Sequence, residues 1–198
     1  SDLHVDLIQT GDSQRENGFV WRDEVGPYWK VWFGGTDGFA TQSIRWTVPE
    51  SGQSDGFFFT SWNDGSRWFS VRDLDGDSFP DLIQTADPSR EGGFVWRDEV
   101  GPYWKVWRGE MNGFSQVPIV WRVPDSGLDD GFFALQWSNA TRWFATIDVN
   151  GDALPDLIQT ANPAREGGHV FSDARGSFWK VWANNGDGFS TVHIRWSV

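Results

Sequence analysis

The sequence predicts an all-β fold that is built from repeated units, and three observations lead to this prediction. The segment Asp-Leu-Ile-Gln-Thr begins at Asp6, Asp81 and Asp156, so the chain repeats with a period of 75 residues. Short runs of β-branched and aromatic residues alternate with clusters of Gly, Asp, Pro and Ser, as strands alternate with turns. No segment shows the period of about 3.6 residues that marks an amphipathic helix.

A finer comparison halves this period to about 37 residues. Gly followed by Phe or His begins each shorter unit, a Trp lies near its middle, and an Ile lies near its end. The pattern predicts one domain, residues 1–198, that contains five units of two alternating types. Their approximate bounds are 18–48, 56–85, 93–123, 131–160 and 168–198.

Each unit is expected to contain three strands, because three runs of aromatic and β-branched residues are separated by turn residues. In the first unit these strands are residues 19–22, 28–33 and 43–48. In the third of them Ile44, Trp46 and Val48 alternate with polar residues. This alternation predicts a strand with one buried face and one exposed face.

Residues 3–10 are expected to form an additional strand before the first unit, and the strand with which it pairs has to be inferred. An unpaired strand edge favours aggregation, and closed repeat folds remove such edges by pairing their first and last units. We therefore expect residues 3–10 to pair with the C-terminal strand, 193–198, and so to close the fold. If one chain does not close by itself, its open edges are expected to drive the formation of a homodimer.

Two acidic loops, residues 73–81 and 148–156, carry the pattern Asp-x-Asp/Asn-Gly-Asp-x-x-x-Asp. Oxygen-bearing side chains occupy positions 1, 3, 5 and 9, and the Gly at position 4 allows the backbone to turn sharply. Ca²⁺ binds about 6–8 oxygen ligands, so these side chains and the carbonyl oxygen of position 7 suit this ion. The predicted ligands are Asp73, Asp75, Asp77, Phe79 and Asp81 in the first loop and Asp148, Asn150, Asp152, Leu154 and Asp156 in the second.

The alternative is that each loop is an acidic turn that binds nothing. The full ligand set occurs twice with the same spacing, which favours calcium as a cofactor. The corresponding turns at 34–39, 109–114 and 184–189 have too few carboxylates for a metal site. Residues 2–6 match only the second half of the loop, so no metal is expected there.

The loop pattern, followed by an apolar strand, resembles the calcium loop of the FG-GAP/VCBS repeats that form the blades of integrin-type β-propellers. The resemblance covers residues 73–85 and 148–160. It implies a closed β-propeller, here of about five 37-residue units, and an extracellular or carbohydrate-binding role, because some fungal and bacterial members are lectins. Alternate units lack the acidic loop, unlike a propeller of identical calcium-binding blades, so the number of blades stays open.

A second repeated segment lies in the units without the acidic loop, at residues 15–24, 90–99 and 165–174. It places charged side chains close to aromatic residues. Charged groups form directional hydrogen bonds with sugar hydroxyls, and a flat ring covers the C–H face of a sugar. The candidate carbohydrate-binding residues are Arg15, Glu16, Trp21, Arg22, Asp23, Tyr28, Arg90, Glu91, Trp96, Arg97, Asp98, Tyr103, Arg165, Glu166 and Asp173. The alternative is that these charges form surface salt bridges that hold a hairpin.

Composition limits the classes of partner. The net charge of −12 argues against nucleic acids and anionic membrane surfaces, which bind basic patches. No apolar run reaches the ~18 residues needed for insertion into a membrane, and the chain has no cysteine. Residues 1–20 are polar and show no secretory signal, so the secreted location that the resemblance implies has a cytoplasmic lectin as its alternative.

The expected function is that of a multivalent lectin that binds glycans or glycoproteins and uses calcium ions structurally. No catalytic motif is present, and the three His residues lie at unrelated positions of the repeat, so an enzyme is not expected. A protein-binding adhesion propeller is the first alternative. A polysaccharide lyase or hydrolase is the second, because carboxylates that could act in pairs are abundant.

Overall fold

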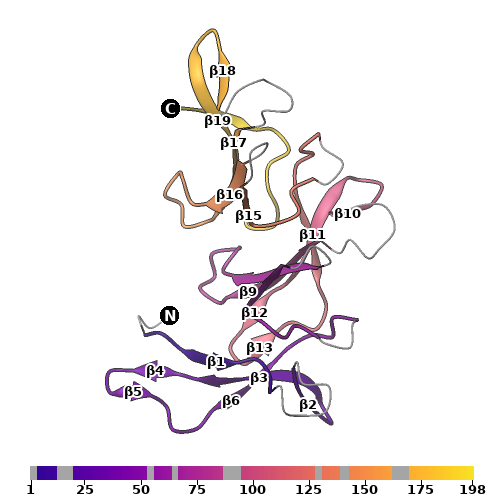
Figure 1. Ribbon diagram of the computed structural model, residues 1–198, viewed down its shortest axis with the longest axis vertical. Helices are drawn as coiled ribbons and strands as arrows, with labels where there is room; N and C mark the ends of the chain where they lie inside the picture. Colours follow the sequence, from indigo (N-terminus) through magenta and orange to yellow (C-terminus); the bar gives the residue numbers. More distant parts are fainter. Residues whose placement is uncertain are drawn as a thin grey trace.

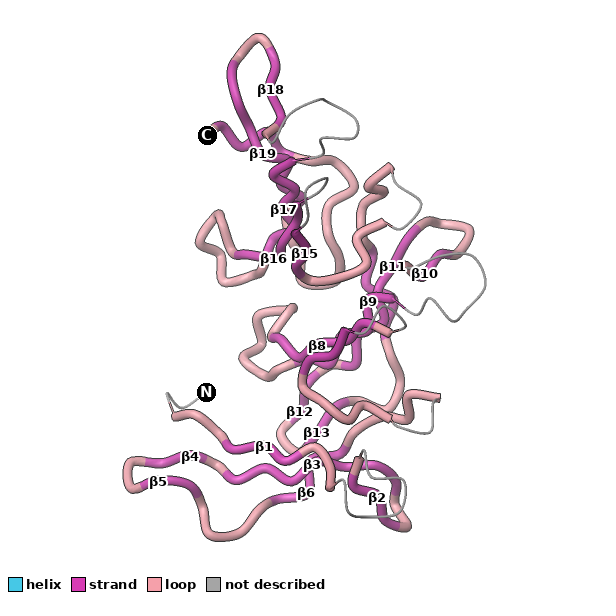
Figure 2. Tube along the Cα trace, in the orientation of Figure 1, coloured by secondary structure: helices cyan, strands magenta, loops and turns pink. Residues whose placement is uncertain are grey.

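The computed structural model describes residues 4–12, 20–52, 56–63, 67–86, 95–127, 131–138, 143–161 and 170–198. Every regular element in these segments is a β-strand (Figures 1 and 2), so the prediction of an all-β fold is confirmed. The strands form three six-stranded sheets and one separate two-stranded hairpin. The sheets follow one another in chain order along the long axis of the molecule (Figure 1).

The first sheet is organised around β3 (Gly26–Trp32), which lies between two sets of partners. One edge of β3 pairs with β6 (Ile44–Thr47), and the other edge is shared by β2 (Trp21–Asp23) and β1 (Leu7–Gln9). β2 pairs with the beginning of β3, and β1 pairs with its end. One long strand therefore holds two short ones in line on the same side.

The second and third sheets repeat this arrangement and extend it by two strands. The second contains β7 (Ser61–Asn63), β8 (Trp68–Arg72), β9 (Asp81–Ala86), β10 (Trp96–Arg97), β11 (Pro102–Trp107) and β14 (Ile119–Arg122). The third contains β15 (Gln136–Ser138), β16 (Trp143–Ile147), β17 (Asp156–Ala161), β18 (Phe171–Asp173), β19 (Gly176–Trp182) and β20 (Ile194–Ser197). Each of these sheets draws strands from two of the 37-residue units expected from the sequence, so the units are grouped in pairs.

The pairing register shows that the 75-residue period is structural. Leu7 lies opposite Trp32 in the first sheet, Leu82 opposite Trp107 in the second, and Leu157 opposite Trp182 in the third. A shift of one residue would turn every side chain of a strand to the other face of its sheet. The three sheets therefore present the same faces to their surroundings.

Short hairpins connect consecutive sheets. The hairpin of β12 (Gly109–Glu110) and β13 (Gly113–Phe114) extends to the first sheet, where β13 pairs in parallel with β6. The corresponding hairpin after β19 makes a parallel bridge from Gly188 to Arg122 in the second sheet. The equivalent hairpin of β4 (Gly34–Gly35) and β5 (Gly38–Phe39) forms a two-stranded sheet of its own.

The predicted pairing of residues 3–10 with residues 193–198 is wrong. β1 pairs with β3, and the C-terminal strand β20 pairs with β19 in the third sheet. β1 has the sequence of β9 and β17, so it takes the same position beside the long strand of its own sheet. The two chain ends are marked at separate positions along the long axis (Figure 1).

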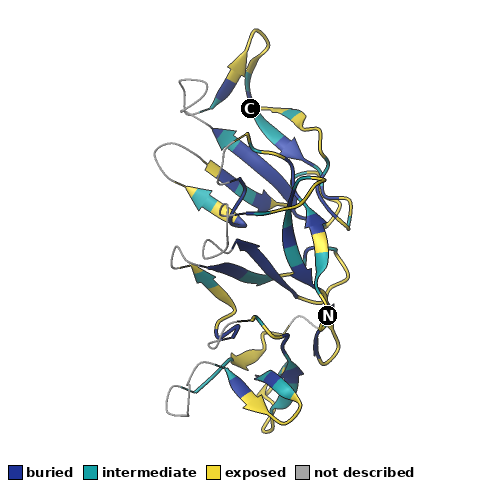
Figure 3. Cartoon of the chain, turned by 90° about the vertical axis from the view of Figure 1, so that its right-hand side faces the viewer, coloured by how far each residue is buried: buried dark blue, intermediate teal, exposed yellow. Residues whose placement is uncertain are grey.

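The core is aromatic and lies between the sheets (Figure 3). Trp29, Trp104 and Trp121 are among the largest fully buried side chains. Two of the buried indole N–H groups are paired with backbone carbonyls: Trp29 Nε1 donates to the Phe57 carbonyl over 2.8 Å, and Trp104 Nε1 donates to the Phe132 carbonyl over 2.7 Å. The same hydrogen bond thus recurs one period later and joins consecutive sheets.

Candidate functional site

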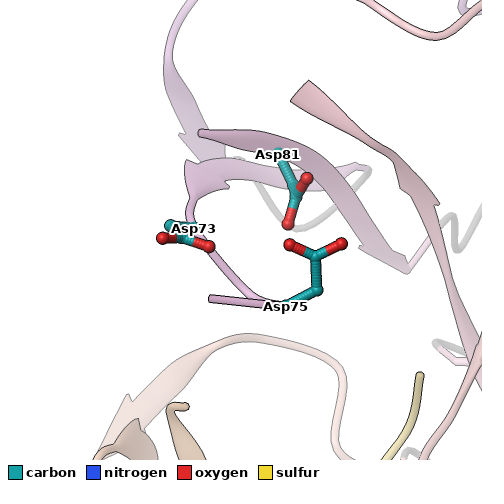
Figure 4. Close-up of side chains that lie close together, drawn as sticks. All are labelled: Asp73, Asp75 and Asp81. Carbon is teal, nitrogen blue, oxygen red and sulfur yellow. The ribbon is translucent and has the colours of Figure 1, made fainter. Parts of the chain in front are cut away.

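The first acidic loop connects β8 to β9 and brings three carboxylates together. One oxygen from each of Asp73, Asp75 and Asp81 lies within 4.8 Å of the others (Figure 4). The carboxylates of Asp75 and Asp81 face one another, and Asp73 lies at the side of the loop (Figure 4). Alternate loop positions and the first residue of β9 therefore point toward one centre, as the sequence pattern predicts.

Backbone N–H groups hold these carboxylates in place. The Asp73 carboxylate accepts hydrogen bonds from the N–H of Gly76 at 2.8 Å and of Ser78 at 3.0 Å, which closes the loop on itself. The buried Asp81 carboxylate accepts from the N–H of Leu74 and of Gly109, both at 2.9 Å. Because Gly109 begins β12, Asp81 ties the loop to the hairpin that reaches the first sheet.

The loop backbone has two residues in left-handed conformations. Gly76 has φ of 79°, which glycine adopts at little cost, and Ser78 has φ of 74°. Residues other than glycine lose roughly 1–3 kcal/mol in such conformations, so the surrounding contacts must stabilise this one. The second loop has the same pair, Gly151 at 82° and Ala153 at 71°. The shape is therefore a repeated property of the loop.

The clustered charges change the acidity of the site. Burial raises the pKa of Asp81 to about 6, and the nearby charges of Asp75 and Asp77 add to this effect. Burial likewise raises the pKa of Asp75. A cation is present beside the site, since Arg108 Nε lies 3.2 Å from Asp75 Oδ2. Sequence reasoning missed this arginine because it follows a different strand, β11.

The second acidic loop connects β16 to β17 and has the same internal hydrogen bonds. Asp148 accepts from the N–H of Gly151 at 2.7 Å and of Ala153 at 3.0 Å. Asp156 accepts from the N–H of Asn184 at 3.0 Å, and burial raises its pKa. The side chains differ from those of the first loop. Among the described residues, three acidic side chains converge within 4.8 Å only in the first loop.

Asn150 explains this difference between the loops. It stands where the first loop has Asp75, and its side-chain amide donates to Asp152 Oδ2 over 2.9 Å. The amide oxygen accepts from the Asp152 N–H at 2.9 Å. An amide oxygen is a weaker ligand for a hard cation than a carboxylate, so the second loop has the poorer donor set.

The first loop fits a hard divalent cation by its chemistry. Its three convergent carboxylates offer only oxygen atoms. Burial, with a smaller contribution from the charges of Asp77 and Asp73, raises the pKa of Asp75, and a bound cation would offset both effects. Asp73, Asp75 and Asp81 would hold such an ion. Asp77 is not part of the triad, and its Oδ1 accepts from the Phe79 N–H at 2.8 Å. The roles of Asp77, Phe79, Asp152 and Leu154 as ligands stay predictions.

The candidate sugar-binding residues of the first unit lie on the β2–β3 hairpin. Trp21 is only 6% exposed, and its ring stacks on Tyr28 with 6.4 Å between the ring centroids. The ammonium group of Lys30 lies 3.5 Å from the centroid of the Trp21 ring. Trp21 is therefore enclosed by its own hairpin, and the more exposed groups beside it are polar.

An ion pair continues this arrangement on the same face. Arg45 Nε donates to Asp23 Oδ2 over 2.9 Å, and the Arg45 guanidinium lies 4.9 Å from the centroid of the Tyr28 ring. Asp23 also accepts from the N–H groups of Val25 and Gly26. These donors, the Arg45 hydrogen bond first among them, lower the pKa of Asp23 to about 2. Arg22 pairs separately with Glu50.

The second sheet repeats the arrangement with one displacement. Trp96 stacks on Tyr103 at 6.5 Å, Lys105 lies 3.7 Å from the Trp96 ring, and Asp98 pairs with Arg122 at 2.7 Å. Arg122 follows the position equivalent to Arg45 by two residues. Side chains two apart on a strand share a face, so the arginine still reaches its aspartate.

The third sheet keeps the same geometry with different aromatic residues. Phe171 stacks on Phe178 at 5.7 Å, and the Lys180 ammonium lies 4.1 Å from the Phe171 ring. Asp173 pairs with Arg195 at 3.0 Å, and this pairing is the main cause of its lowered pKa of about 2. We call this five-residue group of each sheet, a Lys, two rings, an Arg and an Asp, the aromatic column.

Several candidates remain outside these columns. Arg97 lies on β10 with Asp125 at 3.9 Å. Six further candidates lie outside the described residues: Arg15, Glu16, Arg90, Glu91, Arg165 and Glu166. Sequence reasoning missed the basic members of the columns. The lysines carried a usable signal, because they recur at 75-residue spacing as Lys30, Lys105 and Lys180.

Comparisons with known proteins find no relative, so the functional conclusion rests on the geometry of the acidic loops and the aromatic columns. No family model, no curated protein and no solved structure matches the chain. Within the described segments, no helix is long and apolar enough to cross a membrane.

Proposed function

We propose that this chain is a multivalent carbohydrate-binding protein whose acidic loops bind calcium as a structural ion. The observation that supports sugar binding most is the aromatic column. It places a paired aspartate and arginine next to stacked rings, and it occurs once in each of the three sheets. Repeated weak sites that contact one glycan surface raise the overall affinity by roughly 10²–10⁴ over a single site.

The polar end of each column is the part that suits a sugar. The side chains of Asp23 and Arg45 are 36% and 29% exposed, and those of Asp98 and Arg122 are 38% and 33% exposed. A carboxylate accepts and a guanidinium donates charge-assisted hydrogen bonds, which suits vicinal hydroxyl groups. Because Trp21 is enclosed, we assign it to support of the column, and we assign the contact with sugar to the Asp–Arg pair.

The calcium ion has a different place in this proposal. Asp73, Asp75 and Asp81 would hold it, and the ion would neutralise their mutual repulsion. β10 pairs with the beginning of β11, whereas β9, which follows the acidic loop, begins opposite the end of β11. Loops and columns therefore lie at opposite ends of the sheet. The ion braces the link from loop to hairpin and does not contact the sugar.

The finer fold belongs to the same proposal. We take each sheet, which spans about 75 residues, as one blade of a β-propeller-type repeat. Support comes from the common register of the three sheets and from the hairpins that join neighbouring sheets in the same way. This location of repeated sugar sites on separate blades gives the multivalency that the function requires.

Agglutination of red cells, with inhibition by free sugars, tests the proposed function. The informative variant is Asp23→Asn/Asp98→Asn/Asp173→Asn, because it removes one charge from every column. We expect it to lose agglutination and binding to a glycan array. The matched control is Glu24→Gln/Glu99→Gln, which removes neighbouring exposed charges outside the columns and should agglutinate like the wild type.

Other results would overturn the proposal. If the wild type binds no glycan and instead retains a protein partner, the adhesion function is favoured. If it releases reducing or unsaturated sugars from a polysaccharide, the chain is an enzyme. If the triple variant binds glycans as the wild type does, the columns are structural.

A further inference from the structure

The two ends of the stack of sheets expose residues whose repeats are buried between sheets. Phe39, in the free β4–β5 hairpin, is 51% exposed, whereas its equivalents Phe114 and Phe189 are each 3% exposed. Leu7 on β1 is 47% exposed, and its equivalent Leu82 is fully buried. Phe39 therefore differs from its equivalents in whether another sheet covers it, and Leu7 lies on β1, which lacks the second partner strand that β8 provides for β9.

The two internal interfaces show how such a hairpin docks. Phe114 makes edge-to-face contacts with Trp29 at 5.4 Å and Trp46 at 6.0 Å, both in the preceding sheet. Phe189 repeats this docking one period later, with Trp104 at 5.4 Å and Trp121 at 6.2 Å. Two independent copies of one geometry define a knob, the Phe, and a socket, a pair of Trp side chains from adjacent strands.

Backbone contacts fix the position of the knob. The Thr47 N–H donates to the Asn112 carbonyl over 2.9 Å beside β13, and the Phe189 N–H donates to the Arg122 carbonyl over 2.9 Å. A β-carbon on Gly113 would lie 2.5 Å from the Thr47 carbonyl oxygen, so the close approach requires glycine. The free hairpin also has glycine at this position, Gly38, whose φ of 116° favours glycine, and a β-carbon built there would have no atom within 4 Å.

The opposite end of the molecule presents the socket. Trp179 and Trp196 lie opposite one another on β19 and β20, in the register of Trp29 and Trp46. Trp196 is 37% exposed, whereas its equivalent Trp46, which contacts a knob, is 8% exposed. Trp179 also lines an open hollow of about 580 Å³ on this face.

The same face carries further uncovered apolar side chains. Trp143 is 53% exposed, but its equivalent Trp68 is 8% exposed because Phe133 and Trp137 of the next sheet pack on it. Exposed apolar surface of this extent is typical of an interaction site. The chain thus carries one free knob at its N-terminal sheet and one free socket at its C-terminal sheet.

We propose that copies of this chain associate head to tail, with Phe39 of one protomer inserted between Trp179 and Trp196 of its partner. The β4–β5 hairpin would then lie along β20, with Gly38 opposite the residue equivalent to Thr47, Ser197 of the partner. The partner is a second copy because the chain already makes this contact twice within itself. Knob and socket are different surfaces, so the contact is heterologous and joins further copies into rings or filaments.

Sedimentation equilibrium at physiological ionic strength, where the charge of −12 on each copy is screened, measures this association. We expect the wild type to exceed its monomer mass of 22.5 kDa as the concentration rises. Phe39→Ser and Trp196→Ser each remove one surface and should each raise the dissociation constant about 10-fold or more. Val100→Ser, at a site that is 78% exposed in the turn between β10 and β11, is the control and should associate like the wild type.

Mixing the two variants tests the head-to-tail geometry directly. Trp196→Ser keeps an intact Phe39, and Phe39→Ser keeps an intact socket, so an equimolar mixture should form a dimer that cannot grow further. A two-fold symmetric contact would instead stop the wild type at a dimer at every concentration. Trp143→Ser changes another uncovered side chain of the same face, and it replaces Trp196→Ser in the mixture if that variant does not keep the melting temperature of the wild type.

Three results would overturn the proposal. One is a wild type that stays monomeric at every concentration. Another is association of Phe39→Ser with the affinity of the wild type. The third is a mixture of folded variants that stays monomeric, because the intact knob of one and the intact socket of the other would then fail to bind.

Discussion

The two acidic loops have nearly the same backbone and different chemistry. Both close through an aspartate that accepts two backbone N–H groups, and both hold a non-glycine residue at positive φ in the same place. The first has Asp75 and a nearby Arg108, where the second has Asn150 and Ala183. The comparison shows that the shared aspartates and glycine set the loop shape, and we expect calcium affinity to depend on the positions that differ.

The largest expected effect is loss of the buried aspartate that anchors each loop. Asp81→Ala leaves the N–H groups of Leu74 and Gly109 without their acceptor, and an unsatisfied buried group costs roughly 1–3 kcal/mol. We expect a loss of about 3 kcal/mol in the free energy of unfolding, measured with urea in EDTA. Asp156→Ala should cost less, since the Val149 N–H lies 3.4 Å from Asp156. Equal stability of Asp81→Ala and the wild type would contradict this role.

The pH dependence of the metal-free protein is the next largest effect. Burial raises the pKa of Asp81 to about 6, whereas the pKa of an aspartate in the unfolded chain is about 4. Between these two pH values the folded state therefore binds more protons than the unfolded state. The contribution of Asp81 to stability should therefore be greatest below about pH 4 to 5. The free energy of unfolding should fall by up to about 2 kcal/mol as the pH rises through 6. Melting temperatures in EDTA between pH 4.5 and 7 check this, and Asp81→Asn should flatten the profile.

The aspartates of the columns do not obscure that window. The pKa values of Asp23, Asp98 and Asp173 are lowered to about 2, mainly by their arginine partners. Their contribution is complete above pH 4 and is lost only as pH falls toward 2. If the metal-free protein became more stable between pH 4.5 and 7, ionisation of the buried Asp81 would not destabilise the folded state, and this prediction would be wrong.

Exchange of the differing ligand sharpens the comparison between the loops. Asp75→Asn gives the first loop the composition of the second, and Asn150→Asp does the reverse. We expect calcium affinity to fall about tenfold in the first variant and to rise by a similar factor in the second, about 1.4 kcal/mol each. Titration calorimetry measures both. Unchanged affinity in the two variants would show that position 3 is not a ligand.

The smallest expected effect concerns the neighbouring cation. Arg108 Nε lies 3.2 Å from Asp75 Oδ2 and is partly exposed, so it competes weakly with a bound ion. Arg108→Ala should raise calcium affinity about threefold at low salt and less at high salt. Ala183→Arg in the second loop is the reciprocal variant and should lower affinity. Loss of affinity on removal of Arg108 would mean that it orients Asp75.

Much of this architecture is predictable because the chain repeats its signals. Strands β9 and β17 and the convergence of Asp73, Asp75 and Asp81 follow from local patterns that are fixed by the pleat and by alternation. The approximate period of 75 residues appears directly in the pairing register. Local chemistry alone was sufficient for these features.

Other features depend on long-range pairing, which local patterns do not encode. The half-period similarity suggests equal units, yet β9 and β10 from two such units share one edge of β11. The predicted pairing of β1 with the C-terminal strand is wrong for the same reason, because pairing between distant strands is not encoded in the local sequence. The burial of Trp21 depends on Lys30, which reaches it from the neighbouring strand. In each case the deciding neighbour lies on another strand.

Thermal unfolding of the wild type in EDTA and in increasing Ca²⁺ tests the central claim most directly. The claim is that the first acidic loop binds calcium as part of the folded scaffold. Binding to the folded state alone adds RT ln(1 + [L]/Kd), so the melting temperature should rise steadily with the logarithm of calcium concentration. The rise should be smaller in Asp75→Asn. Superimposable unfolding curves with and without calcium would contradict the account.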